Sequence, residues 1–243
     1  MYLLMTRFLM NKRLFAFLTV LLLTRALFAD SRNIVYNESF TFNEIDILDI
    51  SLSYENLKIS QIYGDEIVIE IGSNNIQKIP LVSLEQDDLA CSLKITTKTK
   101  RTDPGNDCTV YLYIPQDFFA GEIDISMVSG NLQADILKAK NALNIKNTSG
   151  RIDIATVTTD FLNTGCISGN IKLQKVSAAY FNIKNTSGNI FVELEKPVEA
   201  SSRITTISGK IQVYYKKNES PFMDDSPDFI ISTVSGKIET VAY

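Results

Sequence analysis

The sequence predicts an all-β protein that folds as a parallel β-solenoid, a β-helix-like stack of rungs of about 20 residues each. The dipeptide Ser-Gly occurs six times in the second half of the chain, at successive spacings of 20, 19, 19, 21 and 27 residues. Apolar and polar residues alternate on both sides of each copy, and β-branched residues are frequent there, as in half-buried strands. The six copies are Ser129 with Gly130, Ser149 with Gly150, Ser168 with Gly169, Ser187 with Gly188, Ser208 with Gly209, and Ser235 with Gly236.

Each Ser-Gly dipeptide is predicted to form a corner of the solenoid, because the alternation changes parity across it. A glycine at a corner allows a positive φ angle or a close backbone approach, and we expect the serine hydroxyl to bond a nearby backbone group. Stacking in register would pair the strands of successive rungs in parallel, about 4.8 Å apart. Four residues before the serine stand Ile125, Ile145, Thr164, Ile183, Ile204 and Ile231, and two after the glycine stand Leu132, Ile152, Ile171, Ile190, Ile211 and Ile238.

An antiparallel β-sandwich is the alternative fold, because short strands at regular spacing also suit it. Hairpin turns in such folds usually contain Asn-Gly or Asp-Gly. A sandwich also has no need for one apolar register to recur about every 20 residues. The repeat therefore favours the solenoid.

The predicted domain organisation is a signal peptide at residues 1–29 and a single β-solenoid domain at residues 30–243. Within this domain, residues 30–120 form irregular N-terminal rungs and residues 121–243 form the regular Ser-Gly rungs. Residues 57–71 resemble a degenerate rung centred on Gly64. The polar residues 215–228 form an insertion that explains the spacing of 27 residues.

The leader has the three parts of a secretory signal. Basic residues precede an apolar run at residues 14–23, and Ala29 offers a small residue at the cleavage site. We expect the mature protein to be extracytoplasmic, either periplasmic or secreted, with association with the cell surface as a further option. An uncleaved N-terminal anchor is the alternative. No segment after residue 30 is apolar enough to span a bilayer as a helix, so no transmembrane segment is expected after signal removal.

Composition argues against an enzyme and against a nucleic-acid partner. The chain has no histidine, which removes the usual general base and a usual zinc ligand, so we expect neither a metal nor another cofactor. Without residues 1–29, 20 basic residues stand against 28 acidic ones. Binding to phosphates would require the opposite balance.

A carbohydrate-active enzyme would need clustered acids. The candidates are Asp124, Asp153 and Glu239, together with Glu193 and Glu195. Residues equivalent to Asp153 in other rungs are mostly not acidic, so we expect a mixed solvated face and no catalytic residue. The aromatic residues Phe161, Tyr180, Phe181 and Phe191 form either an exposed strip for contact with a sugar or protein, or part of the core.

The three cysteines are assigned structural roles. Cys91 and Cys108 lie 17 residues apart, and an oxidising compartment permits a disulfide between them, with buried thiols as the alternative. Cys166 shares its repeat position with Asn147 and Asn185, which predicts a small buried side chain stacked between two amides and not a reactive thiol.

The rungs resemble the repeat of the bacterial "putative adhesin" domain family of unknown function, which is similar to the head domains of "putative" auto-transporter adhesins. The motifs that carry this resemblance are Ile145-Lys-Asn-Thr-Ser-Gly-Arg-Ile-Asp-Ile154, Ile183-Lys-Asn-Thr-Ser-Gly-Asn-Ile-Phe-Val192 and, before the regular rungs, Tyr111-Leu-Tyr-Ile-Pro115. The resemblance implies a right-handed β-helix-like solenoid in the cell envelope and implies no established activity. A C-terminal membrane barrel and a long stalk, which true auto-transporters have, are not found in this sequence.

The leading hypothesis is a non-enzymatic extracytoplasmic protein of the cell envelope, an adhesin-like binding or structural module whose partner is a protein or a glycan. The alternatives are a carbohydrate-active β-helix enzyme and an envelope-stress sensor or accessory protein. The sequence names neither the ligand nor the oligomeric state.

Overall fold

The computed structural model describes residues 33–41, 45–86, 90–97, 107–195, 202–215 and 230–242. Contacts group Ile34–Tyr243 into one compact unit, and the description below concerns that unit. The predicted signal peptide and most of the predicted insertion at 215–228 lie outside the described residues.

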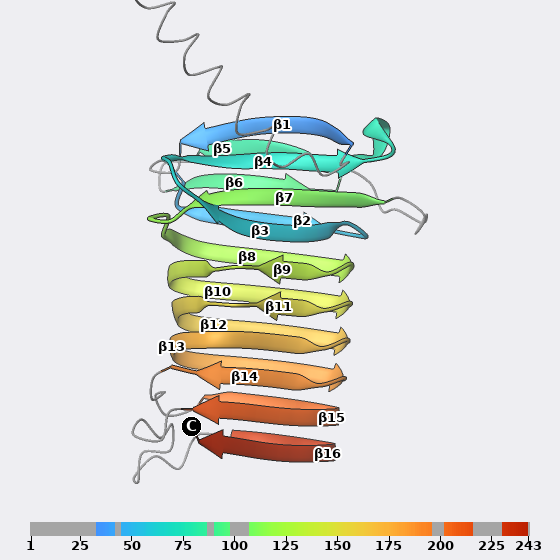
Figure 1. The fold of residues 1–243 in the computed structure, drawn as a ribbon, viewed down its shortest axis with the longest axis vertical. Helices are drawn as coiled ribbons and strands as arrows, with labels where there is room; N and C mark the ends of the chain where they lie inside the picture. The colour runs from blue at the N-terminus through green and yellow to red at the C-terminus, as the bar shows by residue number, and fades with distance from the viewer. Residues whose placement is uncertain are drawn as a thin grey trace, which may run out of the picture. The chain divides into compact units, whose positions relative to one another are not determined.

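The described part of the unit is built from strands that belong to a single 16-stranded sheet, wound into a stack of rungs (Figure 1). Each regular rung has two walls joined by a corner at Ser-Gly. Wall A contains the strand segments that end at the serine, and wall B contains the segments that follow the glycine. The strands of the regular rungs are β8 (Ala120–Ser129), β9 (Leu132–Ala134), β10 (Leu137–Ser149), β11 (Ile152–Ile154), β12 (Val157–Ser168), β13 (Ile171–Ser187), β14 (Ile190–Leu194), β15 (Arg203–Tyr215) and β16 (Ile230–Ala242).

Neighbouring rungs pair in parallel and in the register that the repeat predicts. On wall A, β10 pairs in parallel with β8 and β12, while on wall B, β11 pairs in parallel with β9 and β13. The serines of the six corners are partners of one another from rung to rung, from Ser129 at one end to Ser235 at the other. The prediction of an all-β solenoid is confirmed, and the antiparallel sandwich is excluded for these rungs.

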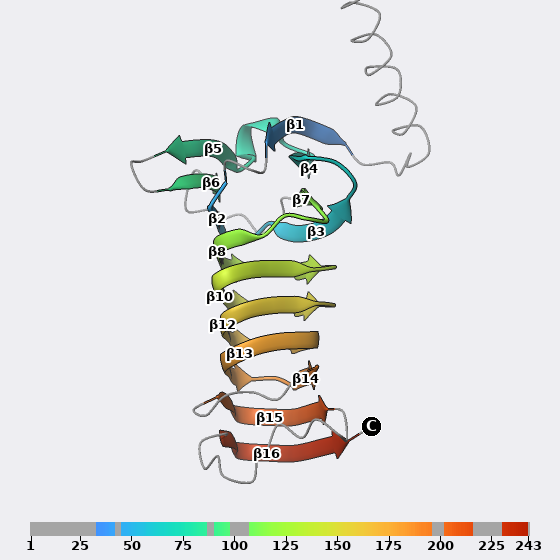
Figure 2. The same cartoon turned by 90° about the vertical axis from the view of Figure 1, so that its left-hand side faces the viewer.

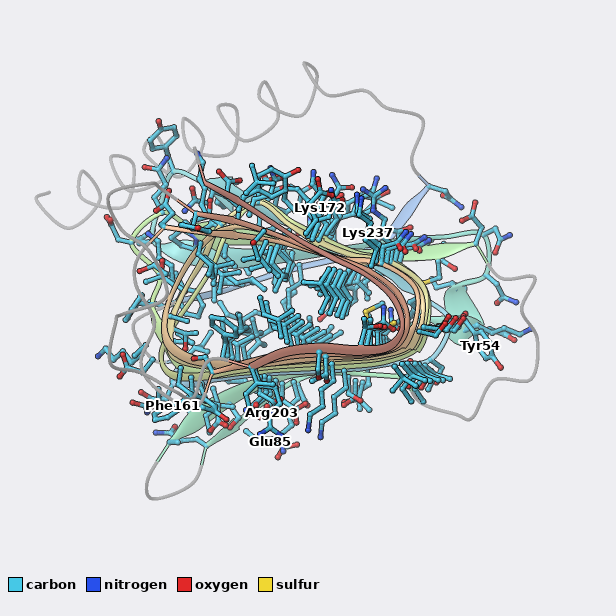
Figure 3. All side chains as sticks on the ribbon, turned by 90° about the horizontal axis from the view of Figure 1, so that it is seen from below. Tyr54, Glu85, Phe161, Lys172, Arg203 and Lys237 are labelled. Atoms are coloured by element: carbon cyan, nitrogen blue, oxygen red, sulfur yellow. The ribbon has the colours of Figure 1, made fainter. Side chains whose placement is uncertain are left out.

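The core fills the space between the two walls. The isoleucines four before the serine on wall A, such as Ile145 and Ile183, are buried, and so are Ile152 and Ile190 on wall B. Seen along the stack, these inward side chains superimpose from rung to rung (Figure 3). Because the side chains of a strand alternate between two faces, every second residue of a wall points inward. The residues at the same inward position in successive rungs form an apolar column, and these columns together form a continuous core.

The N-terminal part of the unit combines parallel rungs with an antiparallel cover (Figure 2). Strands β2 and β3 form a rung that pairs in parallel with β8 and β9 on one side and with β6 and β7 on the other. Strand β4 then pairs antiparallel with β7, β1 with β4, and β5 with β6. The elements are β1 (Ile34–Thr41), β2 (Ile47–Leu52), β3 (Asn56–Ile62), β4 (Glu66–Ser73), the short 3₁₀ helix η3 (Ile76–Lys78), β5 (Leu81–Gln86), β6 (Cys91–Thr96) and β7 (Cys108–Pro115).

The prediction of a rung centred on Gly64 was wrong. Gly64 has a φ of 137° and lies in the turn between β3 and β4, and β4 runs antiparallel to its neighbour β7. The corner of this rung is instead at residues 53–55, beside Gly130 of the next rung. Alternation on both sides of a glycine does not distinguish a solenoid corner from a hairpin turn, because both join two half-buried strands.

Candidate functional site

The Ser-Gly corners are held by backbone contacts between rungs. Each of the six glycines has a positive φ, between 124° and 157°. A Cβ atom on Gly188 would overlap the carbonyl oxygen of Gly169 in the neighbouring corner, and the other corner glycines face a backbone carbonyl in the same way. The Gly188 N–H donates to the carbonyl of Ser208 at 2.9 Å. Only glycine fits this combination of backbone angle and close approach.

The serine hydroxyls do not have the role that the sequence predicted for them. Five of the six corner serines are exposed and Ser129 is half-buried. In the described part of the chain, the ladder between corners runs through the serine carbonyls, and we find no hydrogen bond from a hydroxyl of this column. The expected hydroxyl bond is therefore absent. In five of the six corners, the serine and the residue before it are both exposed.

The side chains two residues before the serine form the hydrogen bonds to the corner backbone that were expected of the serine hydroxyl. Asn147 Nδ2 donates to the carbonyl of Gly130 at 3.0 Å, and Asn185 Nδ2 donates to that of Gly169 at 2.8 Å. Both amides are buried, so these bonds satisfy groups that water does not reach. From the sequence, this column was expected to bury Cys166 between two amides, and the hydrogen bonds of those amides were not predicted. Its recurring polar character was the available signal for a second role.

Cys166 lies in the same column, between Asn147 and Asn185, with its Sγ 3.7 Å from the carbonyl of Gly150. Burial raises the pKa of the Cys166 thiol above its ordinary value of 9.0. A raised pKa reduces the thiolate fraction, which is the nucleophilic form. This environment suits a structural thiol.

We expect iodoacetamide at pH 8 to alkylate Cys166 in the folded protein at least roughly tenfold more slowly than in the urea-unfolded chain, because the folded thiol is both covered and more fully protonated. Because the unfolded thiol releases its proton first, its titration should lower the free energy of unfolding as the pH rises above 9.0. Peptide mass spectrometry measures the alkylation rate, and Cys166→Ser, which removes this thiol, is the control for the pH effect. Equal alkylation rates in both states would contradict the assignment.

Cys91 and Cys108 are both buried, at the starts of β6 and β7. The register places Cys91 level with Asp46, before β2, and Cys108 level with Glu55, after β2. The length of β2 separates these levels by about 20 Å, whereas a disulfide requires Cα atoms within about 7 Å. This placement weighs against the bridge, which stays a prediction until thiols are counted in the unfolded, unreduced chain.

A buried glutamate replaces the Ser-Gly corner in the rung of β2 and β3. Glu55 is fully buried, and its Oε2 accepts hydrogen bonds from the backbone N–H groups of Ser53 and Tyr54, both at 2.9 Å, and from Thr97 Oγ1 at 3.0 Å. A carboxylate that accepts several hydrogen bonds can be buried at an acceptable cost. Sequence reasoning missed this residue because nothing local marks it.

Three of the acidic residues considered for catalysis, Asp124, Asp153 and Glu239, are separated and partnered. Asp124 lies on wall A and accepts from Asn144 Nδ2 at 2.8 Å. Asp153 and Glu239 lie on wall B, where Asp153 pairs with Arg151 at 2.7 Å and Glu239 pairs with Lys210 at 2.7 Å. The bond to Lys210 lowers the pKa of Glu239. These contacts give each of the three carboxylates its own hydrogen-bond or ion-pair partner, and they do not bring two of the three together on one wall around a common site.

A groove of about 550 Å³ lies along the edge opposite the Ser-Gly corner. We call it the edge groove. Its floor contains Ala139, Thr159 and Ala178, one from each of three neighbouring rungs. At this level, residues 137–139, 157–159 and 176–178 run side by side. These three side chains are small and buried. The complete lining is Phe119, Ala139, Lys140, Asn141, Thr158, Thr159, Asp160, Ser177, Ala178 and Ala179.

Two aromatic residues border this groove. Phe161 and Tyr180 directly follow the lining residues Asp160 and Ala179, and they are register partners with ring centroids 5.9 Å apart. Phe161 is 53% exposed. In the view along the stack, it lies far from Tyr54, which belongs to the corner at residues 53–55 (Figure 3).

The expected aromatic strip is thus divided among three places. Phe161 and Tyr180 face outward on wall A, whereas Phe181 is fully buried in the core. Phe191 faces outward on wall B, with its ring centroid 5.0 Å from that of Tyr214. The alternation of the strand decides this division, because Tyr180 and Phe181 are neighbours in sequence and must point in opposite directions.

Within the described ranges we find neither a cluster of three metal-ligating side chains nor a helix long and apolar enough to cross a bilayer. The fold and these surfaces define a β-solenoid with separate, partnered carboxylates on its two walls and a groove beside an aromatic pair. The chain belongs to the Toastrack DUF4097 family, whose profile matches residues 45–239. This membership confirms the resemblance to a "putative adhesin" family of unknown function.

Two crystal structures illustrate the similarity. A "putative adhesin" from Bacteroides fragilis NCTC 9343 has 12% sequence identity and a TM-score of 0.51, covering 85% of this chain and 96% of that chain. A "putative cell adhesion protein" from Clostridium sporogenes ATCC 15579 has 13% identity and a TM-score of 0.47, covering 86% of this chain and 99% of that chain. No curated protein matches the sequence. At this level of identity, the first structure supports the fold alone.

Proposed function

We propose that the protein is a non-enzymatic, extracytoplasmic binding module of the cell envelope, and that it binds a glycan in the edge groove. The observation that carries the proposal is the outward-facing pair of the exposed Phe161 and the half-buried Tyr180 beside a hollow with polar walls. The leader at residues 1–29 supports the location, because its basic start and apolar run are those of a secretory signal.

A sugar offers apolar ring faces and hydroxyl groups at the same time. Exposed aromatic rings can stack on the apolar faces, while Lys140, Asn141 and Asp160 supply donors and acceptors along the groove. The rungs below are fixed by parallel hydrogen bonding on both sides, so binding costs little ordering of the protein. A rigid platform of this kind suits recognition.

The distribution of carboxylates favours binding over hydrolysis. Glycoside hydrolysis requires two carboxyl groups on either side of the scissile bond. Among the described residues that line the groove, Asp160 is the one carboxylate. Asp124 and Asp153, on walls A and B, are held in the contacts described above.

On an array of cell-surface oligosaccharides, we expect the mature protein to bind a subset and Phe161→Ala to bind that subset roughly tenfold more weakly, because it loses the stacking surface. Phe191→Ala is the matched control, since it removes one ring of the other outward aromatic pair, on wall B. Unchanged binding by Phe161→Ala, or cleavage of the bound oligosaccharides, would contradict the proposal.

A further inference from the structure

A row of exposed apolar side chains runs along the Ser-Gly corner, on the side of the unit opposite the edge groove. The residue before the corner serine is 51% exposed in Val128, 56% in Ile167, 53% in Ile207 and 82% in Val234. The two remaining rungs carry Thr148 and Thr186 at this position, also exposed. Large apolar side chains aligned in one exposed row need an explanation, whereas single ones do not.

The rows on either side of this apolar row contain only cationic and neutral residues. The third residue before the serine is Lys146 or Lys184 in two rungs, and the residue after the glycine is Arg151, Lys210 or Lys237 in three. None of these three rows contains an acid, and neither does the row of corner serines between them, although acids outnumber bases in the chain by 28 to 24. We call these four rows, the three just described and the row of serines, the corner surface.

Part of this positive charge is uncompensated. Arg151 and Lys210 form ion pairs with carboxylates of wall B. Lys146 and Lys184 are exposed, and neither forms an ion pair within the part of the chain that the structure describes. In the end-on view, Lys237 lies on wall B (Figure 3). The apolar row therefore has cations on both sides.

The register makes this surface straight and preorganised. Corner residues pair position by position between rungs, so the apolar row advances about 4.8 Å per rung and about 24 Å over six rungs. β-branched side chains also have few rotamers to lose on burial. An apolar strip with flanking lysine and arginine residues is the arrangement by which peripheral proteins lie on anionic membranes.

We propose that the corner surface binds a bilayer that contains anionic phospholipid. The apolar row enters the boundary between headgroups and acyl chains, and the lysines on both sides contact the phosphates. A second copy of the chain fits this surface less well, because two corner surfaces placed together would bring their lysine rows into contact. This surface is separate from the edge groove, so the inference does not depend on glycan binding.

The test is sedimentation of the mature protein with vesicles of phosphatidylcholine and phosphatidylglycerol in equal parts, compared with vesicles of phosphatidylcholine alone. We expect binding to the anionic vesicles that weakens as the salt concentration rises. The double variant Lys146→Gln/Lys184→Gln should partition roughly 25-fold less, at about fivefold per lysine. The double variant Ile167→Ser/Ile207→Ser should partition about tenfold less, because it removes the apolar contact.

Two controls make the result specific. Lys140→Gln/Lys175→Gln removes the same charge from exposed positions on the side away from the corner, and should bind as the unaltered protein does. Phe161→Ala should also keep vesicle binding, whatever its effect on glycans. Equal sedimentation of the Lys146/Lys184 and Lys140/Lys175 variants, equal binding to both kinds of vesicle, or a dimer in light scattering that the isoleucine variant abolishes, would overturn the proposal.

Discussion

Replacing Gly188 by alanine is expected to unfold the stack or to lower its free energy of unfolding by at least about 4 kcal/mol. The new Cβ would overlap the carbonyl oxygen of Gly169, and its residue would have to hold a φ of 128°. Neither strain can relax cheaply, because the corner backbone is bonded to the next rung through Gly188 and Ser208. Urea unfolding followed by circular dichroism measures the loss.

Two other glycines separate the causes of this loss. Gly64 has a similar φ of 137°, but a Cβ there would meet nothing within 4 Å, so Gly64→Ala should cost about 1 to 3 kcal/mol from backbone strain alone. Gly165 has neither problem, and Gly165→Ala should change stability by less than about 1 kcal/mol. If Gly188→Ala is no more destabilising than Gly64→Ala, the close approach between corners is not what requires glycine.

Replacing Phe181 by alanine is expected to cost about 3 to 5 kcal/mol, the range for removal of a buried phenylalanine. Phe181 is completely buried, its register partner is the buried Leu162, and its backbone N–H donates to Ser202 Oγ at 3.2 Å. Rungs on both sides hold the walls apart, so the cavity left by the ring cannot close fully. The same unfolding measurement applies.

Phe161→Ala is the matched control for Phe181→Ala. The two phenylalanines lie in adjacent rungs, but Phe161 is 53% exposed, so its loss should cost less than about 1.5 kcal/mol. This comparison also supports the binding experiments, since a stable Phe161→Ala protein can lose glycan binding only through its surface. Similar destabilisation by the two variants would contradict the assignment of Phe181 to the core and Phe161 to the surface.

The repeat allowed the regular rungs to be predicted closely. Equivalent residues such as Ile145 and Ile183 recur at one position, and the structure stacks that position in parallel as expected. The candidate surfaces were only partly predictable. Asp124 and Asp153 looked comparable in sequence, yet they lie on different walls with different partners. The sequence pattern shows that a residue points outward and does not show which outward residues share a surface.

The amino-acid sequence by itself determined the period of the stack, the inward columns and the place of the glycine corners. These features are local: they depend on alternation within one strand and on the backbone angles that glycine permits. Only the tertiary structure decided that β6 and β7 lie against β2 and β3, that Gly64 serves a hairpin turn, and that Glu55 closes a corner. It also decided the edge groove and the corner surface, because strand direction and the neighbours of a residue are set by contacts between distant segments.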